Sequence, residues 1–458
     1  MLHNENSRVK IPALVHFTRL GYEYLSLKNY SGKNLIDEGT NIFIDLLCAA
    51  INRINGIEYT LEDTQKLINE LKLVLDNEDI GRAFYFILLN GYKGIKLVDF
   101  EDSVGEKNSF HVVTELTYKN GPDEFRPDIT VLVNGLPLAF IEVKKPNNKN
   151  GIKAEYDRMN TRVQNKKFRR FINLTQIMVF SNNSPYDDSE VVPLEGSFYA
   201  ASGYKKLFFN HFREEDAQLI SSVPEADEET ENFILKDNNL VSVKHTPEYI
   251  TNRAVDTPTN SIITSLFSFE RILTFLKYAI AYVEKTDENG IVHLEKHLMR
   301  YPQFFATKAI ESKLNQGVKN GIIWHTQGSG KTALAFFNVR YLTDYYQKKG
   351  VIAKFYFVVD RLDLLTQAAN EFRARGLEVE EINSKEEFIN NIQTTGTSNN
   401  TGKLTIIVVN IQKFSKDSIV KKSDYAVNVQ RVYFLDEAHR SYKPTGSFLA
   451  NLFSSDRE

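Results

Sequence analysis

The spacing of apolar residues changes along the chain, and each change predicts a different kind of element. Between residues 41 and 90 apolar residues recur every three or four positions, as at Leu67, Leu71 and Val74, which is typical of amphipathic helices. From about Ser109, short runs of β-branched and aromatic residues predict strands. These predicted strands cover residues 110–118, 128–133, 138–143 and 176–180.

Farther along, apolar runs alternate with stretches compatible with helices. The runs begin at Ile322 and recur at residues 355–359, 404–409 and 432–435, which favours a parallel sheet wound with helices. The acidic stretch 213–232 is interpreted as a solvated helix or a mobile connection, and residues 394–402 as a surface loop. A break at Thr257-Pro258 suggests a domain boundary. We therefore predict two α/β domains, over residues 1–255 and 256–458.

Length and composition narrow the class of protein. The 458 residues are enough for roughly two to four domains. The formal net charge of -3 gives no global case for nucleic-acid binding, so any such binding must use local patches. The single cysteine, Cys48, excludes an internal disulfide and fits a reducing cytosol. Neither a signal peptide nor a membrane-spanning apolar run is found, which predicts a soluble cytoplasmic protein without a membrane partner.

A glycine-rich loop follows the apolar run at Ile322 and leads into a helix-compatible stretch, residues 333–345. This arrangement is typical of loops that hold the phosphates of ATP, because glycines let backbone N–H groups approach phosphate oxygens. Lys331 is expected to reach the β- and γ-phosphates, and the Thr332 hydroxyl to bind Mg²⁺. The other expected nucleotide-binding residues of the loop are Thr326, Gly328, Ser329 and Gly330. His325 stands where the strict pattern has glycine, so an ordinary helix that starts with a lysine is the alternative.

A second motif supports the first. The apolar run 432–435 ends in two adjacent carboxylates, Asp436 and Glu437. In a nucleotide-driven motor, the first acid binds Mg²⁺ through water and the second polarises the attacking water. The alternative is a strand that ends in a solvated charge cluster. The separation of about a hundred residues leaves room for the intervening elements of a RecA-like sheet.

A further constellation lies upstream, where Asp128 begins one predicted strand and Glu142 and Lys144 end the next. Glu142 and Lys144 are two residues apart on a strand, so their side chains share a face. Two nearby carboxylates can bind Mg²⁺, which activates water and stabilises charge on a phosphodiester, while a lysine orients the water. The alternative is a hairpin with charged residues on its wet face, although the apolar flanks indicate a largely buried strand.

The hairpin register decides whether these residues meet. If Asn134 and Gly135 alone formed the loop, Asp128 would oppose Ile141, and Glu142 would point to the other face. A three-residue loop, 134–136, would set Asp128 opposite Glu142. We therefore predict the longer loop, or a bulge that shifts the register by one residue.

Basic residues follow the second strand between Lys153 and Phe171. Such a cluster fits a phosphate backbone, which is contacted through charge independently of sequence. A solvated helix face is the alternative. The cluster comprises Arg162, Lys166, Lys167, Arg169 and Arg170, with Phe168 and Phe171 interleaved.

These motifs together resemble, in order and over essentially the whole chain, the N-terminal part of the R (restriction and translocation) subunit of type I restriction–modification enzymes. The segments that carry the resemblance are Asn108-x-Phe110, Arg126-Pro127-Asp128, Asn134-Gly135-Leu136-Pro137, Ile141-Glu142-Val143-Lys144, Trp324 to Thr332, Asp360-Arg361-x-Asp363-Leu364, Ile411-Gln412-Lys413-Phe414 and Asp436-Glu437-Ala438-His439-Arg440.

The resemblance implies a PD-(D/E)xK endonuclease domain followed by a first RecA-like superfamily-two helicase domain. It implies Mg²⁺ at Asp128 and Glu142, with Lys144 completing the catalytic set, and ATP with Mg²⁺ at Lys331, Thr332, Asp436 and Glu437. Gln303 resembles a residue that contacts adenine; a polar residue at a helix start is the alternative. The implied partners are double-stranded DNA and the methyltransferase (M) and specificity (S) subunits.

Some features depart from the family pattern. The only near fit to the Gln-x-x-x-Tyr element of related nucleases is Gln164-x-x-x-Phe168, so Gln164 is not assigned to the catalytic set, and Asn410 stands where the family often has threonine. The sequence ends at Glu458, whereas a second RecA-like domain would need on the order of 150 further residues. We expect a truncated motor, with an incomplete first domain, that binds nucleotide weakly and does not translocate.

Three functions remain open from sequence alone. The first is an Mg²⁺-dependent type I restriction endonuclease, coupled in the full-length enzyme to ATP-driven translocation. The second is a non-catalytic fragment that binds DNA or the M and S subunits. The third is a superfamily-two DNA helicase of the repair type, which the paired Asp128 and Glu142-Val143-Lys144 disfavour.

Overall fold

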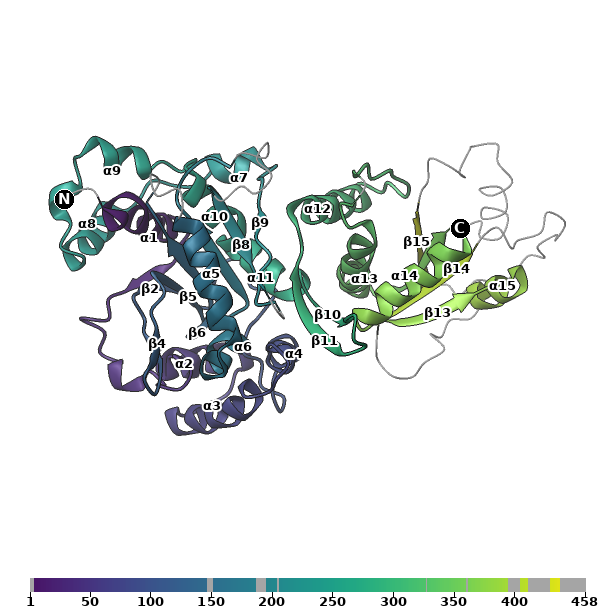
Figure 1. Ribbon diagram of the computed structural model, residues 1–458, viewed down its shortest axis with the longest axis horizontal. Coiled ribbons are helices and arrows are strands. Elements are labelled where there is room, and N and C mark those ends of the chain that lie inside the picture. Colours follow the sequence, from purple (N-terminus) through teal and green to yellow (C-terminus); the bar gives the residue numbers. More distant parts are fainter. Residues whose placement is uncertain are drawn as a thin grey trace. The chain divides into compact units, whose positions relative to one another are not determined.

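The computed structural model describes residues 4–145, 151–186, 195–203, 206–326, 328–359, 361–393, 404–410 and 429–436. The chain forms two compact units, which Figure 1 draws with their element labels. The first unit comprises residues 1–280 and 293–301, and the second comprises residues 281–292 and 302–458.

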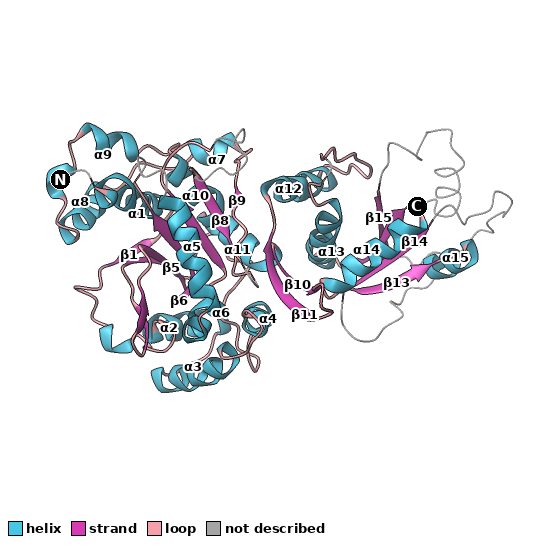
Figure 2. Ribbon diagram, viewed as in Figure 1, coloured by secondary structure: helices cyan, strands magenta, loops and turns pink. Residues whose placement is uncertain are grey.

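The first unit contains a mixed set of helices and strands (Figure 2). Its helical segments are η1 (Asn6–Lys10), α1 (Ile11–Arg19), η2 (Lys33–Leu35), α2 (Ile44–Asn55), α3 (Leu61–Leu75), α4 (Arg82–Asn90), α5 (Gly151–Gln164), η3 (Lys166–Phe168), α6 (Arg169–Leu174), α7 (Ala217–Ser221), α8 (Glu228–Asp237), η4 (Val241–Val243), α9 (Pro247–Asn252), α10 (Pro258–Phe267) and α11 (Phe269–Tyr278). Its strands are β1 (Glu23–Leu25), β2 (Phe110–Thr114), β3 (Tyr118–Asn120), β4 (Asp123–Phe125), β5 (Ile129–Val133), β6 (Leu136–Val143), β7 (Ile177–Ser181), β8 (Ser197–Ala200) and β9 (Asn210–His211).

The main sheet of the first unit has the strand order β1-β2-β5-β6-β7-β8-β9. Strands β2, β5 and β6 are antiparallel neighbours. Strand β7 runs parallel to β6, and the connection between them is the helical segment α5–η3–α6. The strands predicted from residue 110 to residue 180 are confirmed to within a few residues, and the predicted helical region 41–90 contains α2, α3 and α4.

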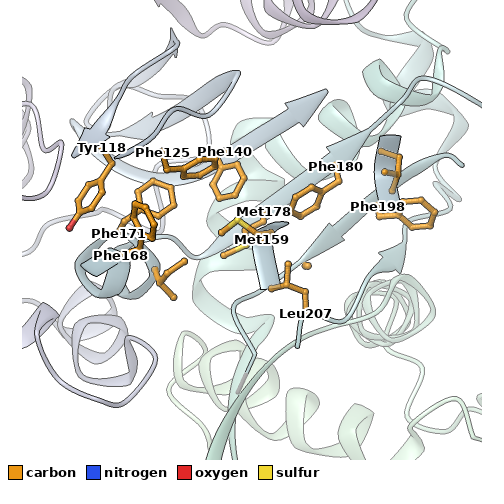
Figure 3. Close-up of a cluster of buried hydrophobic side chains, with 13 residues drawn as sticks. Tyr118, Phe125, Phe140, Met159, Phe168, Phe171, Met178, Phe180, Phe198 and Leu207 are labelled. Atoms are coloured by element: carbon orange, nitrogen blue, oxygen red, sulfur yellow. The ribbon is translucent and has the colours of Figure 1, made fainter. Parts of the chain in front are cut away.

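Both faces of this sheet are covered. On one face, Phe140 of β6 and Phe180 of β7 belong to a buried cluster with Met159 of α5 and with Phe168 and Phe171 (Figure 3). On the other face, side chains that alternate with these point toward different helices. Tyr199 of β8, for example, has its ring 6.3 Å from Phe275 of α11. The sheet is therefore the middle layer of the unit, and its interior strands are buried on both sides.

The sequence break at Thr257-Pro258 is the start of helix α10. The Thr257 side chain accepts a hydrogen bond from Asn260 N–H, and Pro258 occupies the first helical position, a common way to begin a helix. The helix then packs into the first unit, where Phe267 lies 5.5 Å from Phe17 between ring centroids. The first unit thus continues beyond residue 255, where the sequence places the boundary.

The chain passes between the units through β10 (Ile280–Thr286) and β11 (Val292–Leu298). The second unit contains α12 (Tyr301–Asn315), α13 (Lys331–Gln347), β12 (Ile352–Val359), α14 (Leu362–Ala374), β13 (Glu378–Ile382), α15 (Lys385–Gln393), β14 (Thr405–Asn410) and β15 (Val429–Leu435). Its four-stranded sheet has the order β13-β14-β12-β15, and all neighbours are parallel, as the alternating pattern predicts.

One predicted strand of the second unit is wrong. Residues 321–326 have no regular secondary structure, and Ile322 and Trp324 are 87% and 88% exposed. An apolar run forms a strand only where a neighbouring strand pairs with its backbone, and no strand in the described part of the chain pairs with this run. The predicted surface loop 394–402 lies outside the described residues. None of the described helices has the length and apolar character needed to cross a bilayer.

Candidate functional site

The hairpin between β5 and β6 positions the upstream constellation. Asn134 and Gly135 form its loop, and Val133 pairs with Leu136. Both loop residues have positive φ, 54° and 76°, which fits the two-residue turn whose twist matches a hairpin. The predicted three-residue loop is therefore wrong.

The alternative prediction, a bulge, is confirmed. Leu132 pairs with Pro137, but Val131 pairs with Ala139, so Leu138 is an extra residue on β6. From there the register continues to Ile129 opposite Ile141. The next residues along the two strands are Asp128 and Glu142, which consequently share a face of the sheet. A one-residue shift thus brings the two carboxylates together.

The turn itself is held in place by close packing. Gly135 accepts a hydrogen bond from Phe43 N–H, and a Cβ at Gly135 would lie only 2.6 Å from the Phe43 carbonyl oxygen. Asn134 is fully buried, and its side chain accepts from Ser109 N–H and donates to Leu97 O. These contacts fix the end of the hairpin, so the register that they impose is not free to slip.

Asp128, Glu142 and Lys144, which we call the hairpin site, converge at the other end of the hairpin. Asp128 Oδ2 accepts a hydrogen bond of 2.9 Å from Val143 N–H. Lys144 Nζ lies 3.6 Å from Glu142 Oε2 and 4.0 Å from Asp128 Oδ2. It also donates to the Val143 carbonyl at 2.8 Å. The structure therefore brings together all three residues that the sequence selected.

Burial makes the electrostatics of the hairpin site unusual. Burial raises the pKa of Glu142 well above its ordinary value, and the negative charges of Asp128 and Glu155 raise it further. For Lys144, burial alone would lower the pKa, but Glu142 and the other carboxylates outweigh it, so the pKa is raised. The site is thus short of positive charge, with one ammonium among several carboxylates.

Sequence reasoning missed two acidic residues near the hairpin site. Glu155 of α5 is 1% exposed, and its Oε2 lies 3.6 Å from Lys144 Nζ. Glu5, from the segment before η1, has its pKa raised by burial, with smaller effects from Lys144 and Asp128. A signal for Glu155 existed, because Arg158 and Arg162 follow it at helical spacing on the same face. Nothing in the sequence near Glu5 indicates its place.

The hairpin site suits a hard divalent cation. Glu142 Oε1 is buried and accepts no hydrogen bond from the described residues. Asp128 and Glu142 offer carboxylate oxygens, the ligands that Mg²⁺ prefers. In the described part of the chain, no group of three or more His, Cys, Asp and Glu side chains is arranged to hold a metal ion. The donor set therefore fits Mg²⁺ that keeps several waters, rather than a cage built wholly of protein ligands.

The basic segment after β6 does not present the free cations that the sequence suggests. Lys166 and Arg169 pair with Glu78, Lys167 with Asp123, and Arg170 with Asp76. Arg162 pairs with Glu155 at 2.9 Å. The interleaved Phe168 and Phe171 are buried in the core cluster (Figure 3). The alternative of an ion-paired, solvated surface describes these residues better than a dedicated phosphate track.

The glycine-rich loop of the second unit ends at the start of α13. Gly328 and Gly330 have φ of 77° and 85°, in the left-handed region that favours glycine. No side chain caps the N-terminus of α13, so its first-turn N–H groups face the loop uncapped. Ser329 Oγ is buried and has no hydrogen-bond partner among the described residues. We call residues 328–332 the loop site; its helix N-terminus and glycines fit a phosphate group.

The other residues predicted to bind the nucleotide differ in how directly they contact this loop. Gln303 of α12 is 3% exposed, and its Nε2 donates to Gly330 O at 3.1 Å, so it touches the loop directly. Lys331 and Thr332 begin α13, and Thr326 is exposed. Asp436 follows β15, and its N–H donates to Val358 O. Glu437 lies outside the described residues, as do Asp360 and residues 411–414.

Two models of known protein families match separate parts of the chain. Residues 3–186 match the family model for the N terminus of the type I restriction enzyme R protein. Residues 296–456 match the model for the res subunit of type III restriction enzymes. The first match includes the hairpin site, and the second includes the loop site.

Individual proteins that resemble this chain are named as endonuclease subunits of type I restriction enzymes. The chain is 26% identical to the putative type I restriction enzyme MjaIXP endonuclease subunit of Methanocaldococcus jannaschii, over 96% of this chain and 40% of that protein. It is 24% identical to the type I restriction enzyme SauCOLORF180P endonuclease subunit of Staphylococcus aureus, over 92% of this chain and 38% of that protein. The chain thus spans about two fifths of the length of these relatives.

Proposed function

The chain belongs with the R proteins of type I restriction enzymes, and on that premise we propose that its first unit is an Mg²⁺-dependent endonuclease that cleaves double-stranded DNA. The observation that carries the proposal is the convergence of Asp128, Glu142 and Lys144 through the bulge in β6. A hairpin with charges on its wet face would have no need to bury Glu142, which is 6% exposed.

In the proposed mechanism, Asp128 and Glu142 would hold Mg²⁺. The bound cation would activate water and stabilise negative charge on the phosphodiester. Lys144 lies beside both carboxylates, where its ammonium can orient the attacking water or stabilise the developing charge. The fold keeps these groups in place, because they stand at the end of two buried strands whose register is fixed by the bulge and the turn.

We further propose that the loop site binds the phosphates of ATP. Lys331 would contact the β- and γ-phosphates, and Thr332 and Asp436 would hold Mg²⁺. Gln303 contacts the loop backbone, so its effect on nucleotide binding would pass through the shape of the loop as well as through any contact with adenine. Glu437 is assigned, from sequence alone, to polarise the attacking water. In the complete enzyme, ATP hydrolysis would drive DNA translocation.

The word subunit in the relatives' names supports an assembly. We propose that the chain acts with the methyltransferase (M) and specificity (S) subunits, which would supply recognition of the DNA site.

Nicking of supercoiled plasmid tests the nuclease proposal. We expect wild-type protein to nick the plasmid with Mg²⁺ and not with EDTA, and Asp128→Ala and Lys144→Ala to be inactive while still unfolding cooperatively. Nicking that persists at the wild-type rate in both variants would refute the proposal and leave the non-catalytic binding module as the better explanation.

A further inference from the structure

A third carboxylate, Glu155 of α5, lies against the hairpin site. Its side chain is 1% exposed, and its two oxygens differ in their contacts. Oε1 is 2.9 Å from Arg162 Nη1. Oε2 is 3.6 Å from Lys144 Nζ and 3.3 Å from Arg158 Nη2, yet it accepts no hydrogen bond from the described residues. One oxygen is therefore anchored by Arg162, and the other lies between Arg158 and Lys144.

The anchor is packed against the core of the unit. The Arg162 guanidinium lies 4.0 Å from the centre of the Phe125 ring, and α5 is fixed to the sheet by Ile152 and Met159, which are buried in the core cluster. A buried carboxylate held by an arginine costs desolvation, so burial alone does not explain why Glu155 is there. Of the two cations near its second oxygen, Arg158 and Lys144, only Lys144 belongs to the hairpin site.

That ammonium stands among three carboxylates. It is 3.6 Å from Glu142, 3.6 Å from Glu155 and 4.0 Å from Asp128. A divalent cation held by Asp128 and Glu142 would repel the Lys144 ammonium and neutralise the negative charge of those two carboxylates. Among the described residues, Glu155 is the other carboxylate that lies within 4.0 Å of the ammonium, so it could keep the ammonium in place.

We propose that Glu155 is a positioning residue that holds the Lys144 ammonium clear of the cation position between Asp128 and Glu142. This inference rests on the proposed function, because it presumes that the hairpin site binds Mg²⁺. Lys144 now shares its charge among three carboxylates. Without Glu155, the ammonium would be drawn closer to Glu142 and Asp128 and would compete with the metal for them. Glu155 thus acts through Lys144, and its removal should matter only when Lys144 is present.

A double-mutant cycle on metal affinity tests this dependence. Mn²⁺ binding is measured by isothermal titration calorimetry for the wild type, Glu155→Gln, Lys144→Met and the double variant. Glu155→Gln should weaken Mn²⁺ binding about tenfold in the wild-type background, as is common for residues that support metal ligands. With Lys144→Met the same change should weaken binding less than about threefold, because no ammonium is left to compete.

Equal weakening in both backgrounds would overturn the proposal, since Glu155 would then act as a ligand or as a bulk charge. No weakening in either background would overturn it too. Failure of the wild type and Lys144→Met alike to bind Mn²⁺ would instead count against the proposed metal centre itself.

Two controls guard against a folding defect. Glu231→Gln removes another buried carboxylate, which lies 3.3 Å from Arg253 and accepts a hydrogen bond from Tyr249, and it should leave Mn²⁺ affinity unchanged. If Glu155→Gln does not unfold cooperatively, Arg162→Gln replaces it in the cycle. Loss of Arg162 should weaken Mn²⁺ binding by loosening Glu155, whereas a purely electrostatic role predicts tighter binding when a nearby cation is removed.

Discussion

The hairpin site and the loop site hold their residues by different physical means. At the hairpin site, Glu142 and Lys144 side chains are only 7% and 12% exposed, and their positions follow from strand register. At the loop site, glycines with positive φ lead into a helix N-terminus, and the preceding Trp324 is 88% exposed. One site is built by long-range packing and the other by local backbone geometry. Register-built sites should therefore be more sensitive to changes in the fold.

The largest expected effect is on plasmid nicking, and it separates the proposed nuclease chemistry of the hairpin site from nucleotide binding at the loop site. Asp128→Asn removes a carboxylate charge from the proposed metal site and should reduce Mg²⁺-dependent plasmid nicking by at least about a hundredfold, because loss of a ligand costs more than loss of a residue that supports one. Binding of a fluorescent ATP analogue, measured in parallel, should not change. A parallel loss of nucleotide binding would show that the two sites are not separate.

The reciprocal change tests the loop site. Lys331→Ala removes the ammonium expected at the β- and γ-phosphates and should weaken binding of the fluorescent ATP analogue at least about tenfold, a difference of about 1.4 kcal/mol. Calorimetric Mn²⁺ affinity at the hairpin site should stay at the wild-type value. Unaltered nucleotide binding would favour the alternative of an ordinary helix that starts with a lysine.

The sensitivity of the hairpin to packing can be measured with a matched pair of glycines. Gly135 and Gly94 have φ of 76° and 85°, but a Cβ at Gly94 meets nothing within 4 Å. Gly94→Ala should cost only the left-handed strain, about 1 kcal/mol and about 3 °C in melting temperature. Gly135→Ala adds the clash with Phe43 and should lower the melting temperature by about 9 °C.

Calorimetry should also show weaker Mn²⁺ binding for Gly135→Ala than for Gly94→Ala, because the turn fixes the register on which the hairpin site depends. Equal affinities would mean that the bulge holds the register without the turn.

The smallest expected effect is on the melting temperature, because burying the Glu142 carboxyl in the hairpin site destabilises the folded protein. The folded-state pKa of Glu142 is raised, so in the folded protein its carboxyl stays protonated at pH values where the unfolded chain has lost the proton. The contribution of Glu142 to the stability of the folded protein is fully present below the pKa of the unfolded state, and it is lost as the pH rises through the raised pKa of the folded state. In EDTA at pH 8, Glu142→Gln should therefore melt about 3 °C higher than the wild type.

That difference should shrink at pH 5 and reverse when Mg²⁺ is added, because only the wild type then gains binding energy. Lys331→Ala, at the more open loop site, should show no such dependence. A Glu142→Gln variant that melts lower than the wild type at pH 8 without metal would contradict the account.

Local signals in the sequence predicted much of the fold. The Asn134-Gly135 hairpin, the strands around it and the parallel sheet of the second unit are all visible in residue spacing. Thr257-Pro258 misled, because the same pair can end a domain or begin a helix, and only packing of α10 on Phe17 distinguishes these. The run at Ile322 misled because a strand needs a neighbour.

The candidate site shows the same limit. Asp128, Glu142 and Lys144 could be selected from residue type and spacing, but their meeting depended on a bulge at Leu138 that no local pattern specifies. Glu155 escaped notice because it reaches Lys144 from α5, in the connection between β6 and β7, and residue spacing along the strands does not place that helix against the hairpin. The basic cluster was overvalued because its partners, Asp76, Glu78 and Asp123, lie far earlier in the chain.

The most direct test of a metal-dependent centre at the hairpin is the position of a bound ion. Crystals of the protein soaked in Mn²⁺ should give an anomalous scattering peak about 2 Å from carboxylate oxygens of both Asp128 and Glu142, with Lys144 still beside Glu155. The account would be contradicted if crystals with an intact hairpin showed no peak between Asp128 and Glu142, whether or not a peak appeared elsewhere in the protein.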